Sequence, residues 1–363
     1  MLTTEVTMRH RLRTAAGLLA IVFCLPAHPA AQLSTPAGRG LGANYALWSL
    51  GPTSCGFANG YGIVATYNER GVRSAVQSQL AAMHSNGLTS LRFILWYQAF
   101  PLRAEDQWGP VVLTTGAKAQ LQKQHETNIK WFLRDVASAG FQHVEVSMAP
   151  RGRLGPQYSD YTPASVATDW RVVQQVQNAL MASGVPSHTL DLLNEGSPSV
   201  YVRQGPKGTW PAYDANTAQY LSAMYQRFAD TYGTADVVVS SVMEDPDALV
   251  DLVAILRSTG RPMPATFEVH GYFWWYPNLG QGLYDGLARA DATLTGAGLS
   301  QPLALRETYY DNADIATGLQ SWTQDFARPL VEVTTWPLTA GSPCEPWNVA
   351  PPYQAGAYAP LFQ

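Results

Sequence analysis

The sequence has few charged residues and few cysteines for its length. Of its 363 residues, 14% are charged and three are cysteines, whereas 46% are hydrophobic. This composition argues against an intrinsically disordered chain and against a coiled coil, and it supplies enough apolar material for a sizeable core. The formal net charge of −4 makes a nucleic acid an unexpected partner.

The sequence also lacks an apolar run long enough to cross a membrane comfortably. The run at residues 15–26 is shorter than the ~20 residues that a spanning helix needs. Three arginines precede this run and the small residues of "AHPAAQ" follow it, which is typical of a secretory signal. We expect residues 1–31 to be a cleaved signal peptide, and residues 32–363 to be exported to the periplasm or secreted, with no membrane span. A buried first helix is the alternative.

Cysteine usage gives one constraint on the fold. Cys24 leaves with the signal peptide, and the preceding "IVF" fits a lipoprotein box poorly. Cys55 and Cys344 remain, and an even count in an exported chain suggests one disulfide. Because they lie close to opposite ends of the mature chain, this bond requires a fold that brings those ends together.

Several signatures of cofactor and nucleophile chemistry are missing. The histidines show no metal-ligand spacing. No Gly-x-Ser-x-Gly turn occurs with His and Asp partners, and no glycine-rich dinucleotide turn follows the first predicted strand. We therefore expect no metal and no organic cofactor, and we disfavour a serine hydrolase.

What recurs along the mature sequence, without repeats or linkers, is an alternation of strands and helices. Apolar residues at helical spacing occur around 72–83, 131–136, 172–180, 221–228 and 249–256. Eight apolar segments predict strands, at residues 41–45, 88–96, 143–148, 189–193, 235–242, 265–270, 302–307 and 330–336.

This alternation predicts a single-domain (β/α)8 barrel of the α/β class. Parallel strands need a crossover helix between them, and about 300 residues in eight units suit a barrel better than a doubly wound sheet. Closure of the barrel places the eighth strand beside the first, so the loops carrying Cys55 and Cys344 become neighbours. The Pro-rich segment at 342–353 predicts an irregular closing unit without a final helix.

Polar residues follow the apolar strands where a barrel carries its working groups. In such barrels these groups lie at the carboxyl ends of the strands. The predicted strand ends carry Asn44; Arg92 and Trp96; Met148 and Arg151; Asn194 and Glu195; Glu244; His270 and Tyr272; Glu307; and Trp336.

Two carboxylates in this set, Glu195 and Glu307, would face each other across the barrel mouth. A pair of opposed carboxylates suits cleavage of a glycosidic bond, because one protonates the leaving oxygen while the other attacks the anomeric carbon or activates water. Their pKa values must differ, and Arg92 beside one of them would keep it ionised. Four tryptophans near the strand ends could stack on sugar rings: Trp96, Trp274, Trp275 and Trp336.

Motifs on four predicted strands resemble those of clan A glycoside hydrolases. They are "LLNEG" at 192–196, "VHGYFWW" at 269–275, "LRETYY" at 305–310 and "TTW" at 334–336. The resemblance covers roughly residues 41–337. It implies a retaining reaction with Glu195 as acid/base and Glu307 as nucleophile. It also implies that Asn194 binds the sugar 2-hydroxyl, that Arg92 and Tyr272 contact the nucleophile, and that Trp336 is a sugar platform. His270 matches the His of the His-x-Tyr motif that many members share, and we expect it among the substrate-binding residues.

Other carboxylates and a second arginine have structural interpretations. Glu244 could line a sugar subsite, and Glu268 could point into the barrel and pair with a base. Asp191 and Glu332 lie inside strands, where structural pairing is the better explanation, and Arg306 is expected to form a surface pair. Structural explanations also remain open for Arg92, Asn194, His270, Tyr272 and the tryptophans.

The sequence thus predicts an exported glycosidase that acts on a polysaccharide or oligosaccharide. The long segments at 98–116 and 151–168 would wall a cleft, which favours endo action, whereas loops closing a pocket would favour exo action. A secreted sugar-binding barrel without turnover and a transglycosylase on the same site are the alternatives. The sequence does not indicate an oligomeric state.

Overall fold

The computed structural model describes most of the chain beyond residue 39. The described residues are 40–45, 63–98, 111–116, 118–150, 162–196, 213–339, 348–349 and 358. The predicted signal peptide, Cys55, Cys344, Arg151 and most of the two predicted cleft walls lie outside these residues, so the disulfide and the cleavage site stay predictions.

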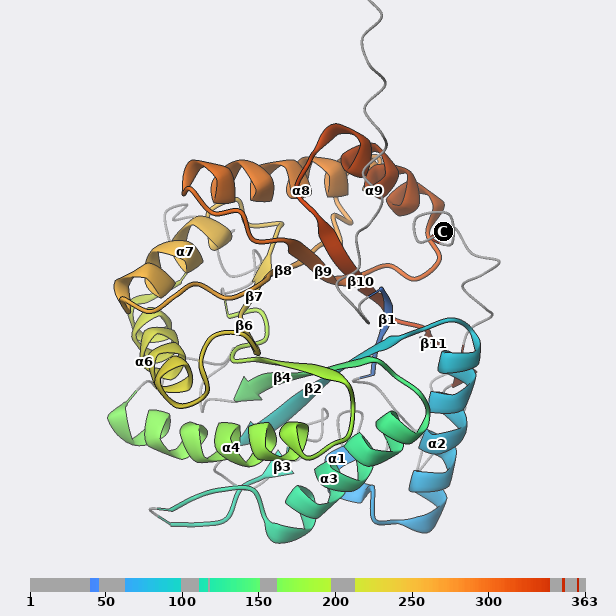
Figure 1. The fold of residues 1–363 in the computed structure, drawn as a ribbon, viewed down its shortest axis with the longest axis vertical. Helices are drawn as coiled ribbons and strands as arrows, with labels where there is room; N and C mark the ends of the chain where they lie inside the picture. The colour runs from blue at the N-terminus through green and yellow to red at the C-terminus, as the bar shows by residue number, and fades with distance from the viewer. Residues whose placement is uncertain are drawn as a thin grey trace, which may run out of the picture. The chain divides into compact units, whose positions relative to one another are not determined.

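The predicted (β/α)8 barrel is confirmed. Parallel strands form a continuous hydrogen-bonded series in which the last predicted strand pairs with the first, and helices surround them (Figure 1). Each predicted strand coincides with one or two observed strands. These strands are β1 (Leu41–Asn44), β2 (Ser90–Gln98), β4 (His143–Pro150), β5 (Ser187–Asp191), β6 (Val237–Val238), β7 (Ser240–Val242), β8 (Phe267–His270), β9 (Leu303–Thr308) and β10 (Leu330–Thr335).

The barrel closes through a strand that is interrupted at one residue. The predicted strand at 235–242 is divided at Val239 into β6, which pairs with β5, and β7, which pairs with β8. The interruption has a local cause, because the backbone N–H of Ser240 donates to Asp191 Oδ1 at 3.1 Å. That N–H is thereby directed to a side chain of the neighbouring strand.

Within the described ranges, seven longer helices form the crossovers, and a short helix precedes the first of them. The five helices that apolar spacing predicts are present, as the buried Val72, Val76, Leu80 and Met83 of the first long helix illustrate. The helices are α1 (Ile63–Thr66), α2 (Arg70–Ser85), α3 (Lys123–Ser138), α4 (Pro163–Met181), α6 (Ala215–Tyr232), α7 (Ala248–Ser258), α8 (Leu279–Gly296) and α9 (Ala313–Asp325).

Three short strands lie outside the barrel series. β3 (Val111–Val112) pairs with β2, and β11 (Leu338–Thr339) pairs in antiparallel fashion with β12 (Asn348–Val349) after the last barrel strand. The irregular closing unit remains a prediction, because most of the chain beyond residue 339 lies outside the described residues.

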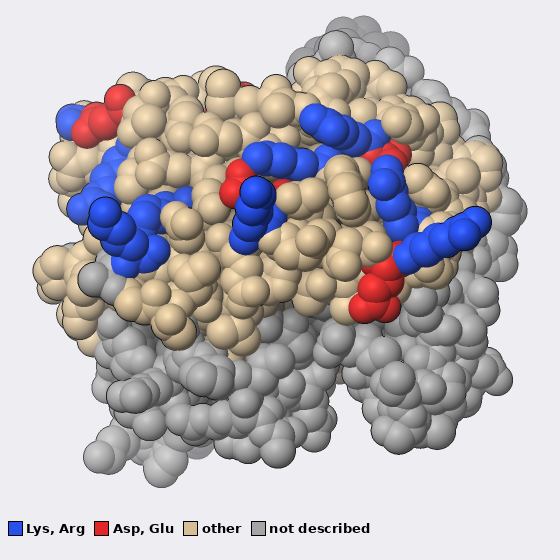
Figure 2. All heavy atoms as spheres, turned by 90° about the horizontal axis from the view of Figure 1, so that it is seen from below, with Lys and Arg blue, Asp and Glu red and all other residues tan. Residues whose placement is uncertain are grey.

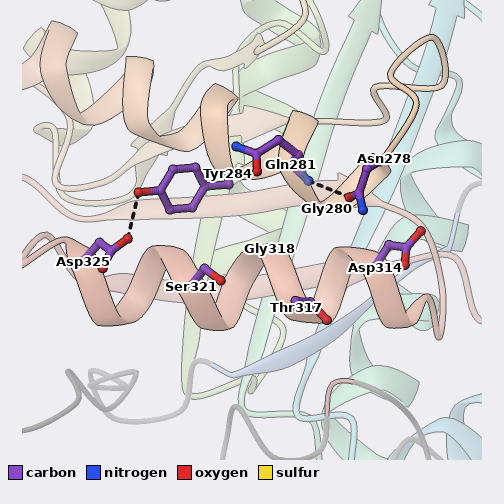
Figure 3. Close-up of a pocket in the computed structure, with 9 residues that line it drawn as sticks. All are labelled: Asn278, Gly280, Gln281, Tyr284, Asp314, Thr317, Gly318, Ser321 and Asp325. Carbon is purple, nitrogen blue, oxygen red and sulfur yellow. Dashed lines mark hydrogen bonds between the residues drawn. The ribbon is translucent and has the colours of Figure 1, made fainter.

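Helices α8 and α9 were not predicted, although their buried apolar residues recur at helical spacing, as Leu283, Leu287 and Leu294 do in α8. Their backbones come into close contact at two glycines: a Cβ on Gly318 would overlap the carbonyl oxygen of Gly280, and a Cβ on Gly280 would overlap that of Asp314. Beside this contact lies a polar groove of about 430 Å³ between the two helices (Figure 3). Tyr284 and Asp325 bridge it through a hydrogen bond of 2.8 Å, and none of the predicted site residues lines it.

Charged side chains are dispersed over the face of the molecule that Figure 2 draws. On the face drawn in Figure 2, Lys and Arg side chains are scattered among uncharged ones, and several lie beside an acidic side chain. Surface pairs of this kind include Lys130 with Glu126 and Arg261 with Asp230. Within the described part of the chain, no helix is long and apolar enough to span a membrane.

The close approach of α8 and α9 predicts that Gly318→Ala destabilises the protein. The new Cβ would collide with backbone atoms of Gly280, which cannot move aside like a side-chain tip, so we expect a loss of about 1–3 kcal/mol in the free energy of unfolding. Gly296→Ala is the matched control, because a Cβ there meets nothing within 4 Å and alanine favours a helix. Urea denaturation of the two variants checks this, and equal midpoints would contradict it.

Candidate active site

The carboxyl ends of β5, β8 and β9 bring the two predicted catalytic acids together. One carboxylate oxygen from each of Glu195 and Glu307 and one ring nitrogen of His270 all lie within 4.8 Å of one another. His270 is the last residue of β8, Glu307 lies near the end of β9, and Glu195 follows β5 in a tight turn. Acids that are 112 positions apart in the sequence therefore share one small volume.

Arg92 of β2 lies at the centre of this cluster and is fully buried. A guanidinium carries five N–H donors and no acceptor, so burial requires a partner for each. All five have one: Nε donates to Glu145 Oε1 (2.7 Å), Nη1 to Glu307 Oε1 (2.7 Å) and Asn44 Oδ1 (3.1 Å), and Nη2 to Asn194 Oδ1 (2.5 Å) and Ser147 Oγ (3.0 Å).

Glu307 accepts hydrogen bonds from two sides. Besides Arg92, the hydroxyl of Tyr272 donates to Glu307 Oε2 at 2.8 Å, and that hydroxyl accepts from Trp336 Nε1 at 2.6 Å. Burial and the adjacent Glu307 raise the pKa of Tyr272 well above its usual value, so its hydroxyl remains a donor. A carboxylate that meets only donors is in the environment that suits an anion.

His270 is buried between the two acids and stays neutral over the physiological range. Burial lowers its pKa to about 4, although the adjacent Glu307 opposes this shift. Its Nδ1 lies 3.0 Å from Glu195 Oε1, and its Nε2 faces Nη2 of Arg92 at 3.5 Å. Because Arg92 can only donate, a proton on Nε2 would face N–H groups without an acceptor, which favours the tautomer in which Nδ1–H donates to Glu195.

The turn that carries Glu195 is held by a relay of short hydrogen bonds. Glu195 has a positive φ of 48°, which is unfavourable for a residue with a side chain. Its N–H donates to Ser240 Oγ at 3.0 Å, and that hydroxyl donates to Asp191 Oδ2 at 2.8 Å. Asp191 also accepts from the N–H of Leu193 at 3.0 Å. The structural pairing expected for Asp191 therefore fixes the backbone of the candidate acid.

The surroundings of Glu195 differ from those of Glu307. Burial raises the pKa of Glu195, and the charge of Arg92 opposes that rise only in part. Arg92 hydrogen-bonds Glu307 directly, whereas the Glu195 carboxylate contacts the neutral His270 among the residues that the structure describes. A raised pKa is what a carboxylic acid needs to donate a proton near neutral pH.

The predicted rim residues Glu244, Trp96 and Trp336 also lie near the strand ends. Glu244 Oε1 accepts from the backbone N–H groups of Tyr272 at 2.6 Å and Phe273 at 3.4 Å, so this carboxylate holds the loop after β8. Burial raises its pKa. Trp96 and Trp336 are partly buried and pack against the same small apolar cluster of Ile94 and Ala149.

The expectation that Arg306 forms a surface pair is wrong. Arg306 is fully buried inside the barrel, where Nε lies 2.6 Å from Glu268 Oε1, Nη2 lies 3.0 Å from Glu145 Oε2 and Nη1 contacts Glu332. Alternation along β9 accounts for this, because Leu303 and Leu305 pack in the apolar core and Arg306 lies on the opposite, interior side. Glu307 reaches the interior as well because of a β-bulge, since Leu305 pairs with Val269 whereas Glu307 pairs with His270.

The pairing of Glu268 with a base, by contrast, is confirmed, and a further buried acid joins it. Glu145 is absent from the sequence analysis, yet it contacts both buried arginines. Burial alone would raise its pKa, but Arg306 and Arg92 together lower it well below the usual range. Burial, with Glu145 nearby, raises the pKa of Glu268 well above the usual range.

Two groups of acidic and histidine side chains have the composition of a metal site. They are Glu195, His270 and Glu307 at the strand ends, and Glu145, Asp191 and Glu268 beneath them. Arg92 is 2.7 Å from an oxygen of both Glu307 and Glu145, so it already supplies positive charge to both groups. A second cation would have to lie close to this guanidinium.

Comparisons with known proteins report a likeness of fold. No protein-family model and no curated protein sequence matches the chain. Among solved structures, an exo-beta-1,4-mannosidase from an Opitutaceae bacterium aligns with a TM-score of 0.53 and 14% identity, over 86% of this chain and 55% of that one. This chain therefore spans just over half the length of that mannosidase.

Two further solved structures align over nearly their full length. A glycoside hydrolase family 5 enzyme from Prevotella bryantii, in complex with a xyloglucan tetradecasaccharide, has a TM-score of 0.53 at 14% identity, over 90% of this chain and 96% of that one. An endo-1,4-beta-mannanase from Eisenia fetida has a TM-score of 0.51 at 14% identity, over 92% of each chain. At this identity the likeness shows a shared fold.

The environment of His270 predicts a specific pH dependence of stability. With a pKa of about 4 when folded and 6.5 when free, the folded chain binds fewer protons than the unfolded chain between these values. The free energy of unfolding should therefore fall as the pH drops from 6.5 to 4, by about 2–3 kcal/mol for this residue. Denaturant unfolding of the wild type and of His270→Asn at several pH values measures it. The variant should show the shallower decline, and parallel curves would contradict a neutral buried His270.

Proposed function

We propose that the chain is a retaining glycoside hydrolase with Glu195 as acid/base and Glu307 as nucleophile. The observation that carries this proposal is the pair of carboxylates whose nearest oxygens lie within 4.8 Å. Their surroundings differ in the way that acid and nucleophile require, because Glu307 meets only donors whereas burial raises the pKa of Glu195. The fold shared with three glycoside hydrolases agrees with this assignment.

The short separation of the acids favours double displacement. Retaining enzymes place their carboxyl groups roughly 5–5.5 Å apart, whereas inverting enzymes leave roughly 6.5–9.5 Å for a water molecule. In the first step Glu195 protonates the departing sugar oxygen while Glu307 attacks the anomeric carbon, which forms a glycosyl-enzyme. In the second step Glu195, now ionised, takes a proton from water, and the hydroxyl displaces Glu307 from the sugar.

The neighbours of the two acids have supporting roles in this reaction. Arg92 and Tyr272 orient Glu307 through its two oxygens and disperse its charge until it attacks. The Oδ1 atom of Asn194 is engaged by Arg92 and Ser147, so its Nδ2 is the donor offered to a sugar hydroxyl. The ring of Trp336 is oriented by its N–H bond to Tyr272, and its face would pack against the apolar face of the sugar.

For the substrate, we propose a β-1,4-linked polysaccharide or oligosaccharide of mannose or glucose units. The aligned structures are those of an exo-beta-1,4-mannosidase, an endo-1,4-beta-mannanase and a family 5 enzyme in complex with a xyloglucan oligosaccharide. Export, and endo action in a cleft walled by the segments at 98–116 and 151–168, belong to this proposal. Both predictions come from the sequence pattern alone.

The deciding experiment is a screen of mannans, glucans and their oligosaccharides in which NMR resolves the anomeric configuration of the first products. We expect release of sugars whose initial products keep the configuration of the cleaved bond. Inverted products would contradict Glu307 as nucleophile. Binding without release would favour the sugar-binding barrel, and transfer to added sugar acceptors in place of water would favour the transglycosylase.

Substitution of each acid predicts a distinct kinetic result. Glu307→Gln removes the attacking group and should abolish turnover of every substrate. Glu195→Ala should leave the first step intact for aryl glycosides with good leaving groups, because these need no proton, but slow natural linkages by about 10²–10⁴-fold. Pre-steady-state release of the aryl group measures this difference, with Glu126→Gln on α3 as a surface control. Equal loss on both substrate classes would contradict the acid/base role.

A further inference from the structure

Two tryptophans on the loop after β8 expose much of their apolar side chains. Trp274 is 56% exposed and Trp275 is 42% exposed. Among the described residues four large hydrophobic side chains are exposed, and these two are the aromatic ones. Two adjacent indoles in water form an apolar surface of the kind that marks a binding site.

This loop is attached directly to the catalytic cluster. Tyr272, whose hydroxyl is 2.8 Å from Glu307, precedes Trp274 by two positions, so their Cα atoms are at most about 7 Å apart. The N–H of Gly271 donates to the carbonyl oxygen of Glu307 at 2.9 Å, which joins the start of the loop to β9. The Trp274–Trp275 pair therefore lies at the rim of the site that holds the two acids.

The loop is also rigid, and Phe273 is the reason. Its ring is fully buried against α8, where Gly282 and Gly286 leave the space that a Cβ would fill. Phe273 has a positive φ of 49°, which turns the chain sharply between the buried ring and the exposed indoles. Glu244 binds the N–H groups of Tyr272 and Phe273, so the turn is fixed from both sides.

The two indoles present perpendicular surfaces. Their ring centroids are 5.2 Å apart and their planes meet at 87°. Trp275 is supported from behind by Phe273 and Tyr276, at centroid distances of 6.1 and 6.3 Å. A rigid corner of this kind offers an apolar surface against which the C–H side of a pyranose ring can pack. Because the two indoles are already held in place, binding loses little conformational entropy.

We propose that the Trp274–Trp275 pair is a binding site for a second sugar unit, one that is bonded to the unit at Glu195 and Glu307. This inference rests on the proposed glycosidase function and narrows it, because a site outside the reacting position is of use only to a chain of several sugars. The substrate is then an oligosaccharide or a polysaccharide, and the energy of binding the second unit adds to that of the first.

The experiment measures the kinetics of the double variant Trp274→Ala/Trp275→Ala on substrates of different lengths. We expect KM for β-1,4-linked mannan or glucan hexasaccharides to rise by about tenfold, the loss expected from removing aromatic stacking. The kcat/KM for aryl monoglycosides should stay unchanged, since these cannot reach the pair. Trp274→Phe/Trp275→Phe should recover part of the affinity. Tyr284→Ala, which removes an aromatic ring from the groove between α8 and α9, should leave the kinetics of both substrates unchanged.

Calorimetric binding of the hexasaccharides in a Glu307→Gln background separates this inference from the proposed function. Weaker binding after loss of both tryptophans supports the site even if no sugar is hydrolysed. Equal affinity with and without the pair overturns it. An equal loss of activity on monoglycosides and hexasaccharides, in variants that melt like the wild type, also overturns the inference. The same holds if removal of the pair only converts a dimer to a monomer in size-exclusion chromatography.

Discussion

The buried guanidinium of Arg92 is the constraint on which the site depends. A cation without water must find an acceptor for every N–H, and an unpaired donor or charge in that position would cost several kcal/mol. Here the acceptors include Glu307 and Asn194, the candidate nucleophile and the candidate sugar ligand. The geometry of the candidate site is therefore also a condition for burying Arg92, which ties the placement of these groups to folding of the barrel.

The same barrel gives two chemically identical side chains opposite environments. Glu307 meets a guanidinium and a phenol, whereas Glu195 meets a neutral imidazole and its side chain stays 36% exposed. His270 makes this separation possible because burial keeps it uncharged between the two acids. A protonated histidine at 3.0 Å would favour ionised Glu195 and reduce the contrast between the acids.

The sequence predicts those parts of the structure that follow from regular periodicity. Apolar runs locate every barrel strand, and alternation along β8 places Glu268 inside with His270. Alternation along β4 could also have identified Glu145, which shares its side of the strand with Ser147. Alternation along β9 also places Arg306 inside, opposite to Leu303 and Leu305, whereas the inward position of Glu307 depends on the bulge and does not follow from alternation. Helices α8 and α9 could have been predicted in the same way, because each has buried apolar residues at helical spacing, in addition to the glycines at their contact.

The bulge in β9 has a consequence for how such a protein can change. One strand delivers, in adjacent positions, a cation that neutralises the acids of the barrel interior and the carboxylate proposed to react with the sugar. Loss of one residue from that strand would turn one of the two toward the apolar helices, so its length is fixed. New specificities must then arise in loops, such as the tryptophan-bearing one, whose length and sequence can vary while the ionic centre of the barrel stays intact.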